Sequence, residues 1–516
     1  MSNYRPAPVP LANLVDGIFG ALIIGGGTVS VTGVAYHSAD VKPGDLFVCR
    51  RGRRDDGHRH AHEAVGRGAV ALAAEHPIEG LDGIPQVHVA DSRRALSALA
   101  ARFYGHPGSR LRLIGITGTE GKTTTAFLVD SILRAAGRRT GLLGTIVNRV
   151  GPKESRADLT TPEAPDLQRL LWECVEAGVS DVTMEVSSHA LAQGRVADCE
   201  FDVAALTNMH TDHLDYHGSH DAYRLAKMRL FRELGCGPDK KGRGAGVVNA
   251  DDEHAGHFVE VATCPTLTFA VGCPAHVVGR PLLRRLRRTV FRVRTQRWVG
   301  VISLRLTGAF NVGNALAAIG VAECLDIAPG VIRAGLEALR TVPGRFEVIS
   351  RRGAPIVVID FAHTLAAFRQ VLPAVHRLVP GRVITVFGCA GDRDRTKRPG
   401  IGRLVTRLSD YAIVTTDNPA HEDPVEIARE VTAGAREADP ATERHRVILD
   451  RFHAVEAALH LARPGDAVLL AGKGHEEYQY VEGRRVSYSD RSAAMELLRR
   501  ERSRESRWRA RPASAV

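Results

Sequence analysis

A glycine-rich segment near residue 118 has the residue types that bind a nucleotide phosphate. The apolar run RLIGIT leads into GTEGKTT and then into a helical pattern that starts near Lys122. Gly118 and Gly121 would let the backbone bend so that its N–H groups face phosphate oxygens, with the positive end of the helix behind them. In such a P-loop Lys122 reaches the terminal phosphates and Thr123 ligates Mg²⁺. The predicted nucleotide-binding residues are Gly118, Thr119, Glu120, Gly121, Lys122, Thr123 and Thr124.

Acidic and histidine side chains after two later apolar runs could hold a metal ion. Glu185 ends DVTME, and a P-loop needs an acidic metal ligand at the end of a nearby strand. The segment TNMHTDHLDYHG is rich in imidazole and carboxylate groups, His213 among them. Each has an ordinary alternative, because a carboxylate before two serines can cap a helix and most loop histidines bind no metal. Zinc is disfavoured, since no Cys lies close by in sequence and the loop implies Mg²⁺.

These residues need strand ends to position them, and the chain shows alternating strand and helix patterns. Strands are predicted at 70–76, 112–118, 181–187, 201–208, 355–361, 382–388, 411–418 and 466–474. Helical patterns lie between them, as at 123–137 and 425–438. This alternation predicts parallel α/β sheets, with domain boundaries near residues 107 and 340. The arginine-rich end of the chain has almost no apolar residues, and we expect it to be disordered.

The composition is that of an ordinary globular chain. The 516 residues are 44% apolar and 25% charged, which excludes wholesale disorder. A net charge of +11 would suit nucleic acid, a membrane surface or anionic small substrates, but no RNA- or DNA-binding motif accompanies it. Glycines break the apolar stretch 19–36, so no membrane span is predicted. Eight dispersed cysteines and no signal-like segment favour the cytoplasm, with no nucleic-acid or membrane partner.

Ten motifs in order resemble the Mur ligase family, specifically its MurE type. They are TGTEGKTTT, TTPE, MEVSSHALAQGRV, TNMHTDHLDYHGSHDAYRLAKMRLF, GAFNVGNALAA, VPGRFEV, DFAHT, FGCAGDRDRTKRPGIG, TDNPAHEDP and AGKGHEEYQ. The segment VKPGDLFVCRRGRRDDGHRHAHEAVGRGAVA is similar to that type's first domain. The resemblance runs from about residue 30 to 495, and the ordered set is more specific than any single motif.

The resemblance implies an α/β fold of three domains and an ATP-dependent peptide ligase. Residues 1–107 would bind a UDP-linked substrate, 108–338 would form the central P-loop ATP-binding domain, 339–497 would form a Rossmann-like amino-acid-binding domain, and 498–516 would be a basic disordered tail. In the family, ATP phosphorylates a carboxylate, and the amine of an amino acid displaces the phosphate. The implied substrates are a UDP-linked muramoyl dipeptide and an amino acid, and the implied cofactors are ATP and two Mg²⁺ ions. We expect a monomer.

The resemblance also implies roles for individual residues. The catalytic set is Lys122, His213, Lys227 and Arg345. Beyond the loop, ATP would meet Asn311, Arg345 and Asp360. Metal ligands would be Thr123, Glu185, His213 and, as the lysine that the family carbamylates with CO₂, Lys227. Substrates would meet Ser38, Thr160, Thr161, Ser187, Gln193, Arg195, Arg393, Asp417, Asn418, Ala420, Gly472 and Glu476. From the residues alone, Lys227 would be an ordinary helix lysine.

Four departures from the family pattern fall at recognition loops. Ala420 replaces the arginine that grips the distal carboxylate in diaminopimelate-adding members, and this loss removes about 1.5–3 kcal/mol of charged hydrogen bonding. Lysine or another amino acid without a second carboxylate is therefore favoured. Glu120 replaces the usual Asn, so that it either turns outward or weakens ATP binding. FAHTLAAF lacks the usual Pro and Asp, and an arginine is missing beside Ser38, which puts uridine binding in question.

Three functions fit this pattern. The first is a peptidoglycan-precursor ligase that adds the third residue of the peptide. The second is a MurE-like ligase of a specialised-metabolite pathway that acts on another carboxylate. The third is a non-catalytic nucleotide-binding protein, which is disfavoured because all the residues of phosphate and metal chemistry are present together. The identity of the amino acid stays open at this point.

Overall fold

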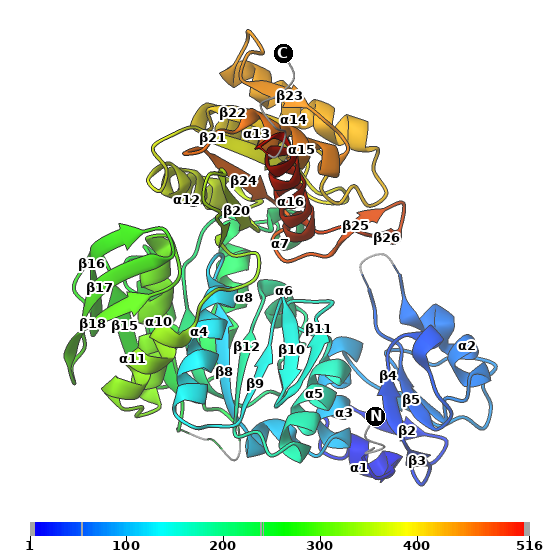
Figure 1. The fold of residues 1–516 in the computed structure, drawn as a ribbon. Helices are drawn as coiled ribbons and strands as arrows, with labels where there is room; N and C mark the ends of the chain where they lie inside the picture. Colours follow the sequence, from blue (N-terminus) through cyan, green and yellow to red (C-terminus); the bar gives the residue numbers. More distant parts are fainter. Residues whose placement is uncertain (1–5, 53–54, 238–239, 241, 510–516) are drawn as a thin grey trace, which may run out of the picture.

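Three α/β units follow one another along the chain in the computed structural model (Figure 1), and a cleft lies between the second and third units. The structure describes residues 6–52, 55–237, 240 and 242–509, and for 501–509 it describes the backbone alone. The predicted strand runs all contain a strand, and each of these strands pairs in parallel with at least one neighbour, within sheets that also have antiparallel strands. The α/β fold class and the succession of three domains are those expected from the sequence.

The first unit is a small sheet with strand order β2-β7-β6-β5-β4. Its members are β2 Leu22–Ile24, β4 Gly33–Ala35, β5 Asp45–Val48, β6 Ala71–Ala74 and β7 Gln86–His88, and β1 Val9–Pro10 pairs separately with β3 Ser30–Val31. Helices α1 Leu11–Val15 and α3 Ser92–Phe103 contribute apolar side chains to one core, and α2 Ala61–Gly66 contributes to another. Phe47 is buried in the second core, so this unit has apolar packing on both faces of its sheet.

The middle unit is built on a sheet of strand order β11-β10-β9-β12-β8-β13-β14-β15-β16-β17-β18. The strands are β8 Arg112–Thr117, β9 Thr140–Leu143, β10 Val147–Val150, β11 Lys153–Arg156, β12 Asp181–Glu185, β13 Phe201–Leu206, β14 Ala245–Asn249, β15 Thr266–Ala270, β16 Val277–Arg285, β17 Arg288–Arg294 and β18 Val299–Leu304. Three parallel neighbours, β12, β8 and β13, lie together within it. Their carboxyl ends therefore meet at one edge, where the chemistry-bearing residues begin.

Helices cover both faces of this sheet. They are α4 Lys122–Ala135, α5 Ala164–Glu176, α6 Ser188–Ala192, α7 Leu214–His217, α8 His220–Arg232, α9 Ala255–Val261, α10 Phe310–Cys324 and α11 Pro329–Ala338. The first and the last two, α4, α10 and α11, pack together over a large apolar core. Helix α4 thus stands on a rigid base, with its first turn at the edge of the sheet.

The third unit is a sheet of strand order β19-β20-β24-β21-β22-β23. Its strands are β19 Glu347–Ile349, β20 Ile356–Asp360, β21 Val383–Phe387, β22 Tyr411–Val414, β23 His445–Val447 and β24 Ala467–Ala471, and its helices are α12 Leu365–His376, α13 Lys397–Leu408, α14 Pro424–Ala438, α15 Arg451–Leu461 and α16 Asp490–Arg509. A hairpin of β25 Tyr478–Val481 and β26 Arg484–Ser487 projects beneath it, toward the middle unit (Figure 1).

The chain end differs from the predicted disordered tail. Helix α16 continues as a helix past residue 498 to Arg509, and residues 510–516 lie outside the described part. Leu497 and Leu498 are buried against the third unit, and Glu496 pairs with Arg500 one turn later. An anchored start and charge pairs at i,i+4 extend a helix into a segment that has few apolar residues.

Candidate active site

The segment Gly118–Gly121 joins strand β8 to helix α4, as predicted for a phosphate loop. Gly118 has φ +145°, and a Cβ there would lie 1.9 Å from Thr207 Oγ1, so only glycine fits. Lys122 begins the helix and its Nζ donates to the carbonyl oxygens of Gly118 and Thr119, at 2.9 Å each. Burial lowers the pKa of Lys122, although Glu185 acts in the opposite direction. The loop therefore surrounds the ammonium group of Lys122, which can reorient toward a bound phosphate.

Thr123 and Glu185 lie together beside the loop. The Thr123 hydroxyl donates to Glu185 Oε2 at 2.8 Å, and it accepts from Arg345 Nη2 at 3.1 Å. Thr145 adds its backbone N–H at 2.7 Å from Glu185 Oε1 and its hydroxyl at 3.0 Å from Oε2. Arg345 belongs to the third unit, so this contact crosses the cleft. The hydroxyl and the carboxylate are the oxygen pair that a P-loop offers to Mg²⁺.

His213 and Lys227 stand on the other side of the loop. His213 has φ +53°, and partial burial lowers its pKa although Asp212 acts in the opposite direction, which favours a neutral ring that can donate a lone pair to a metal ion. Lys227 is buried beneath the loop, where Nζ donates to the Gly118 carbonyl at 2.7 Å and lies 4.7 Å from the centre of the Tyr223 ring. Burial, and then the nearby charge of Lys122, lower the pKa of Lys227 well below its usual value.

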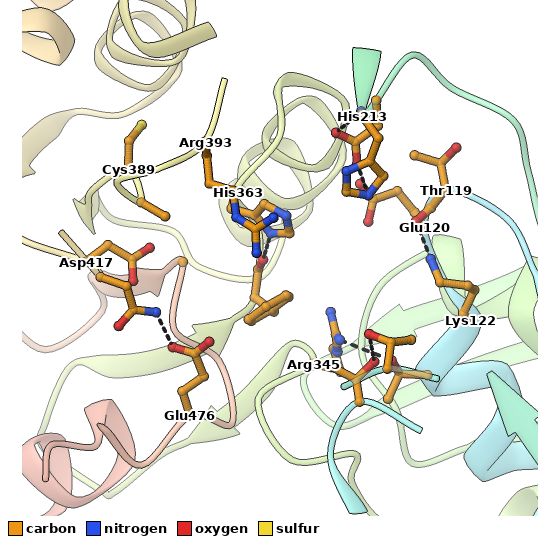
Figure 2. Close-up of a pocket in the computed structure, with 18 of the residues that line it drawn as sticks. Thr119, Glu120, Lys122, His213, Arg345, His363, Cys389, Arg393, Asp417 and Glu476 are labelled. Carbon is orange, nitrogen blue, oxygen red and sulfur yellow. Dashed lines mark hydrogen bonds and ion pairs between the residues drawn. The ribbon is translucent and has the colours of Figure 1, made fainter. Parts of the chain in front are cut away.

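Apart from Lys227, which stays buried beneath the loop, these groups line a cavity of about 340 Å³ between the second and third units. Figure 2 shows Lys122, Thr119 and His213 on one wall, with Arg393, Asp417 and Glu476 across the space. The predicted residues that line it are Thr119, Glu120, Gly121, Lys122, Thr123, Thr124, Thr160, Glu185, His213, Arg345, Arg393, Asp417, Asn418, Gly472 and Glu476. Predicted residues up to 357 positions apart, Thr119 and Glu476, thus share one cavity.

A second cavity, of about 650 Å³, adjoins the first along the phosphate loop. Glu120, Gly121 and Arg345 line both cavities. Asp360 lines the second, where burial raises its pKa to about 6 while its oxygens accept from two backbone N–H groups. Asn314 also lines it, whereas Asn311, which we predicted to contact adenine, donates to the Thr307 carbonyl and lines neither cavity.

The residues predicted around the muramoyl substrate form a hydrogen-bonded cluster beside the first cavity. Thr161 donates to the Glu185 carbonyl at 2.8 Å, and its hydroxyl accepts from the Ser187 N–H at 3.0 Å. Arg195 donates to Gln193 and to the Thr161 carbonyl, so the predicted ligands hold one another in place. Unlike Thr160, these four line neither cavity that holds the phosphate loop. Ser38 lies in the first unit, where its hydroxyl donates to Glu63 at 2.9 Å.

The third unit brings together all but one of the residues that we predicted to bind the amino-acid substrate. Arg393, Asp417, Asn418, Gly472 and Glu476 line the first cavity. The remaining one, Ala420, has φ +55°, donates its N–H to the Tyr480 carbonyl at 2.8 Å and does not line the cavity.

Sequence reasoning missed several residues that hold this site in place. Lys473 is fully buried, and its Nζ donates to Asn418 at 2.9 Å and to Glu476 at 2.7 Å, which offsets the negative charge of the pocket. His475 contacts the Thr145 carbonyl across the cleft at 3.2 Å. Both lie in the motif AGKGHEEYQ, so the family resemblance could have identified them as site residues. Thr145 had no comparable signal.

The donor set fits Mg²⁺ held jointly with nucleotide phosphates. In the described part of the chain, no three His, Cys, Asp or Glu side chains gather closely enough to hold a metal ion by themselves. A P-loop metal takes its remaining ligands from phosphate and water, so one hydroxyl and one carboxylate suffice. Thr123 and Glu185 supply that pair, and His213 lines the same cavity.

Comparison with known proteins agrees with this architecture. Three family models match the chain: "Mur ligase family, catalytic domain" at residues 30–104, "Mur ligase middle domain" at 116–322 and "Mur ligase, glutamate ligase domain" at 344–474. The chain belongs to the Mur ligase family. Within the family it is of the MurE type, an ATP-dependent ligase, which excludes the non-catalytic interpretation.

Individual relatives are similar over nearly their whole length. The UDP-N-acetylmuramoyl-L-alanyl-D-glutamate–2,6-diaminopimelate ligase of Solibacter usitatus is 41% identical, over 91% of this chain and 94% of its own. The protein of the same name from Geobacillus kaustophilus is 40% identical, over 94% and 98%. A solved structure of a ligase of this name has TM-score 0.66 and 29% identity, over 96% and 100%. Thermotoga maritima MurF with ADP shares the fold, with TM-score 0.63, 20% identity and coverage of 92% and 98%.

Proposed function

We propose that the chain joins an amino acid to the D-glutamyl carboxylate of UDP-N-acetylmuramoyl-L-alanyl-D-glutamate. The observation that supports this most is the shared cavity, because it places a phosphate loop opposite a pocket of paired carboxylates and cations. The relatives' names supply the acceptor. The three units then take three roles: substrate binding by 1–107, ATP binding by 108–338 and amino-acid binding by 339–497.

The site groups divide the reaction between them. Lys122 and Arg345 place two cations where the terminal phosphate would lie, and they would stabilise charge as it moves to the attacking carboxylate. Thr123, Glu185 and His213 would hold Mg²⁺, which neutralises phosphate charge when bound. The carboxylate oxygen would attack the γ-phosphorus of ATP, and ADP would leave. The amine of the amino acid would then attack the acyl carbon, the carbon–oxygen bond to phosphate would break, and the amine's proton would go to solvent.

Lys227 would complete a second metal site as a carbamate. Its lowered pKa increases the share of neutral amine, whose lone pair can attack CO₂, and the displaced proton goes to solvent. The product is an anionic oxygen ligand in place of a cation. Burial beneath the phosphate loop supports this modification, because an unmodified ammonium pays a desolvation penalty there.

The amino-acid pocket favours a substrate with an ammonium at its far end. Asp417 Oδ1 is buried without a hydrogen-bond partner in the described part of the chain, although Lys473 Nζ lies 3.7 Å from it, and Glu476 lines the same cavity. Ala420 offers no cation for a second carboxylate. We therefore place lysine above diaminopimelate, although the relatives bear the diaminopimelate name.

A panel of amino acids tests this function. We expect phosphate release to require ATP, the UDP-linked dipeptide and an amino acid together, with lysine above meso-diaminopimelate. Ala420→Arg should shift preference toward diaminopimelate, because the backbone at φ +55° already carries a Cβ there. Release with diaminopimelate alone would overturn the lysine preference, and an unchanged preference in the variant would remove Ala420 as its cause.

A second acceptor class, another carboxylate, is favoured by one observation. Ser38 donates its hydroxyl to Glu63 and lacks the neighbouring arginine of the family pattern, so the uridine contacts differ. Activity with another carboxylate and none with the UDP-linked dipeptide would establish this alternative. In either case we propose that the protein is a cytoplasmic monomer. The described chain contains no helix long and apolar enough to cross a membrane.

A further inference from the structure

The phosphate loop carries a glutamate at residue 120, beside the space for anionic phosphates. Its backbone cannot turn freely, because the N–H donates to Asn208 Oδ1 at 2.9 Å and the carbonyl accepts from Thr207 Oγ1 at 2.6 Å. Figure 2 shows Glu120 on the phosphate-loop wall, with His363 across the cavity. Because the backbone is fixed, only the Glu120 side chain can reorient to bind a partner other than the phosphates.

That partner belongs to the third unit. The Thr364 hydroxyl donates to Glu120 Oε1 at 2.9 Å, across 244 positions of sequence. Thr364 is the N-cap of α12, and the same hydroxyl accepts from the Ala367 N–H at 3.0 Å. The hydroxyl thus has one proton to give and gives it to the carboxylate. The positive end of α12 further favours a negative charge at this point.

We propose that Glu120 is a positioning residue that holds the third unit closed over the phosphate loop and makes ATP binding favour closure. This proposal rests on the proposed ATP-dependent function. In an open arrangement the carboxylate would lie near ATP phosphates without Thr364 and would repel them. In the closed arrangement Thr364 and α12 stabilise it, and Arg345 reaches Thr123 beside it. ATP therefore binds the closed arrangement better than the open one.

The proposal predicts opposite effects on binding and turnover. Glu120→Ala removes both the repulsion and the contact, so the Kd for ATP should fall a few-fold while kcat falls about tenfold. Thr364→Val removes only the contact, so kcat should fall without tighter ATP binding. Glu120→Gln, which keeps an acceptor but no charge, should lie between wild type and Glu120→Ala. Thr364→Ser keeps both hydroxyl roles and should restore turnover.

A double-mutant cycle tests whether Glu120 and Thr364 act through their shared contact. We measure kcat and ATP Kd for wild type, Glu120→Ala, Thr364→Val and the double variant, with melting curves to confirm folding. The double variant should lose no more kcat than one single variant, because both changes remove one contact. Glu426→Gln, in an exposed pair with Arg429, is the matched surface control and should change neither constant.

Two results would overturn the proposal. One is an additive loss of kcat in the double variant. The other is weaker ATP binding with unchanged kcat in Glu120→Ala, which would make Glu120 a nucleotide ligand only. If Thr364→Val fails to fold, Glu120→Ala and Thr364→Ser still test whether ATP binding and turnover change in opposite directions. Failure of the proposed function itself is distinguishable, since wild type would then show no ligation at all.

Discussion

At Lys227 the fold buries a lysine side chain under the phosphate loop. Its one hydrogen bond in the described structure runs to the Gly118 carbonyl, and the charge of Lys122 lies nearby. A buried cation near another cation is costly, so the site gains when the amine becomes anionic or neutral. The residue that looked most ordinary in the sequence is thus among the most constrained in the structure.

Removal of Lys227 tests the carbamate. Lys227→Ala should nearly abolish ligation, because the anionic ligand is lost, and added bicarbonate should not restore it. Wild type in CO₂-depleted buffer should lose activity and recover it with bicarbonate. A carbamate signal in ¹³C NMR after ¹³CO₂ labelling should be present in wild type and absent in the variant. Full activity of wild type without CO₂ would contradict the modification.

A half-buried histidine, His475, gives a pH dependence of stability. Burial, and then Arg345, lower the pKa of His475 from 6.5 to about 4, so the unfolded chain binds one more proton between these values. Folding stability from this residue is therefore present above pH 6.5 and is lost as the pH falls toward 4. His475→Gln should reduce the slope of unfolding free energy against pH by about 1.4 kcal/mol per unit.

Chemical denaturation at pH 4.5–6.5 measures that slope. The matched control is His453→Gln on α15, since the His453 side chain is 67% exposed. We expect the slope to stay unchanged in the control. An equal slope in His475→Gln and wild type would show that burial does not perturb this ring.

At the scale of elements, the site is a set of strand ends. β8, β12 and β13 are parallel neighbours, so the phosphate loop, Glu185 and the segment around His213 emerge at one edge. Strand and helix types, and this edge, could be predicted from apolar periodicity and glycine placement. Contacts such as Thr145 to Glu185 could not, because they depend on how loops far apart in sequence are fitted together. The helical end of α16 was not predicted either, because the prediction relied on its low apolar content and did not consider charge pairs along the helix.

A buried ion pair anchors that last helix. Arg451 on α15 donates from Nε and Nη2 to Asp490 at 2.8 and 2.7 Å, and neither side chain is exposed. Asp490→Ala leaves the guanidinium unpaired and should destabilise the protein by about 3–5 kcal/mol, seen as a lower melting temperature. Glu496→Ala, on the same helix in an exposed pair with Arg500, should change stability by less than about 0.5 kcal/mol. Equal shifts in both variants would contradict this assignment.

At the scale of the whole molecule, the active site exists only where two units meet. Arg345 with Thr123, Thr364 with Glu120, and His475 with Thr145 are polar contacts across the cleft, and Arg485 with Asp158 also joins the two units. The sequence predicted many of the residues that line the first cavity, and their roles stay predictions. It did not predict that the chain alone would adopt this closed arrangement, because closure depends on contacts between large bodies. The arginines of β16 and β17, which add to the net charge of +11, lie largely on an exposed face away from this site.

The acyl-phosphate mechanism is tested most directly by tracing a carboxylate oxygen of the acceptor into the released phosphate. If ATP phosphorylates the acceptor carboxylate, a carboxylate oxygen must leave with the phosphate when the amine attacks. With ¹⁸O in both oxygens of the acceptor carboxylate, mass spectrometry of the released phosphate should show one ¹⁸O per phosphate, formed only with the amino acid present. Release of unlabelled phosphate alongside amide product would contradict the acyl-phosphate mechanism.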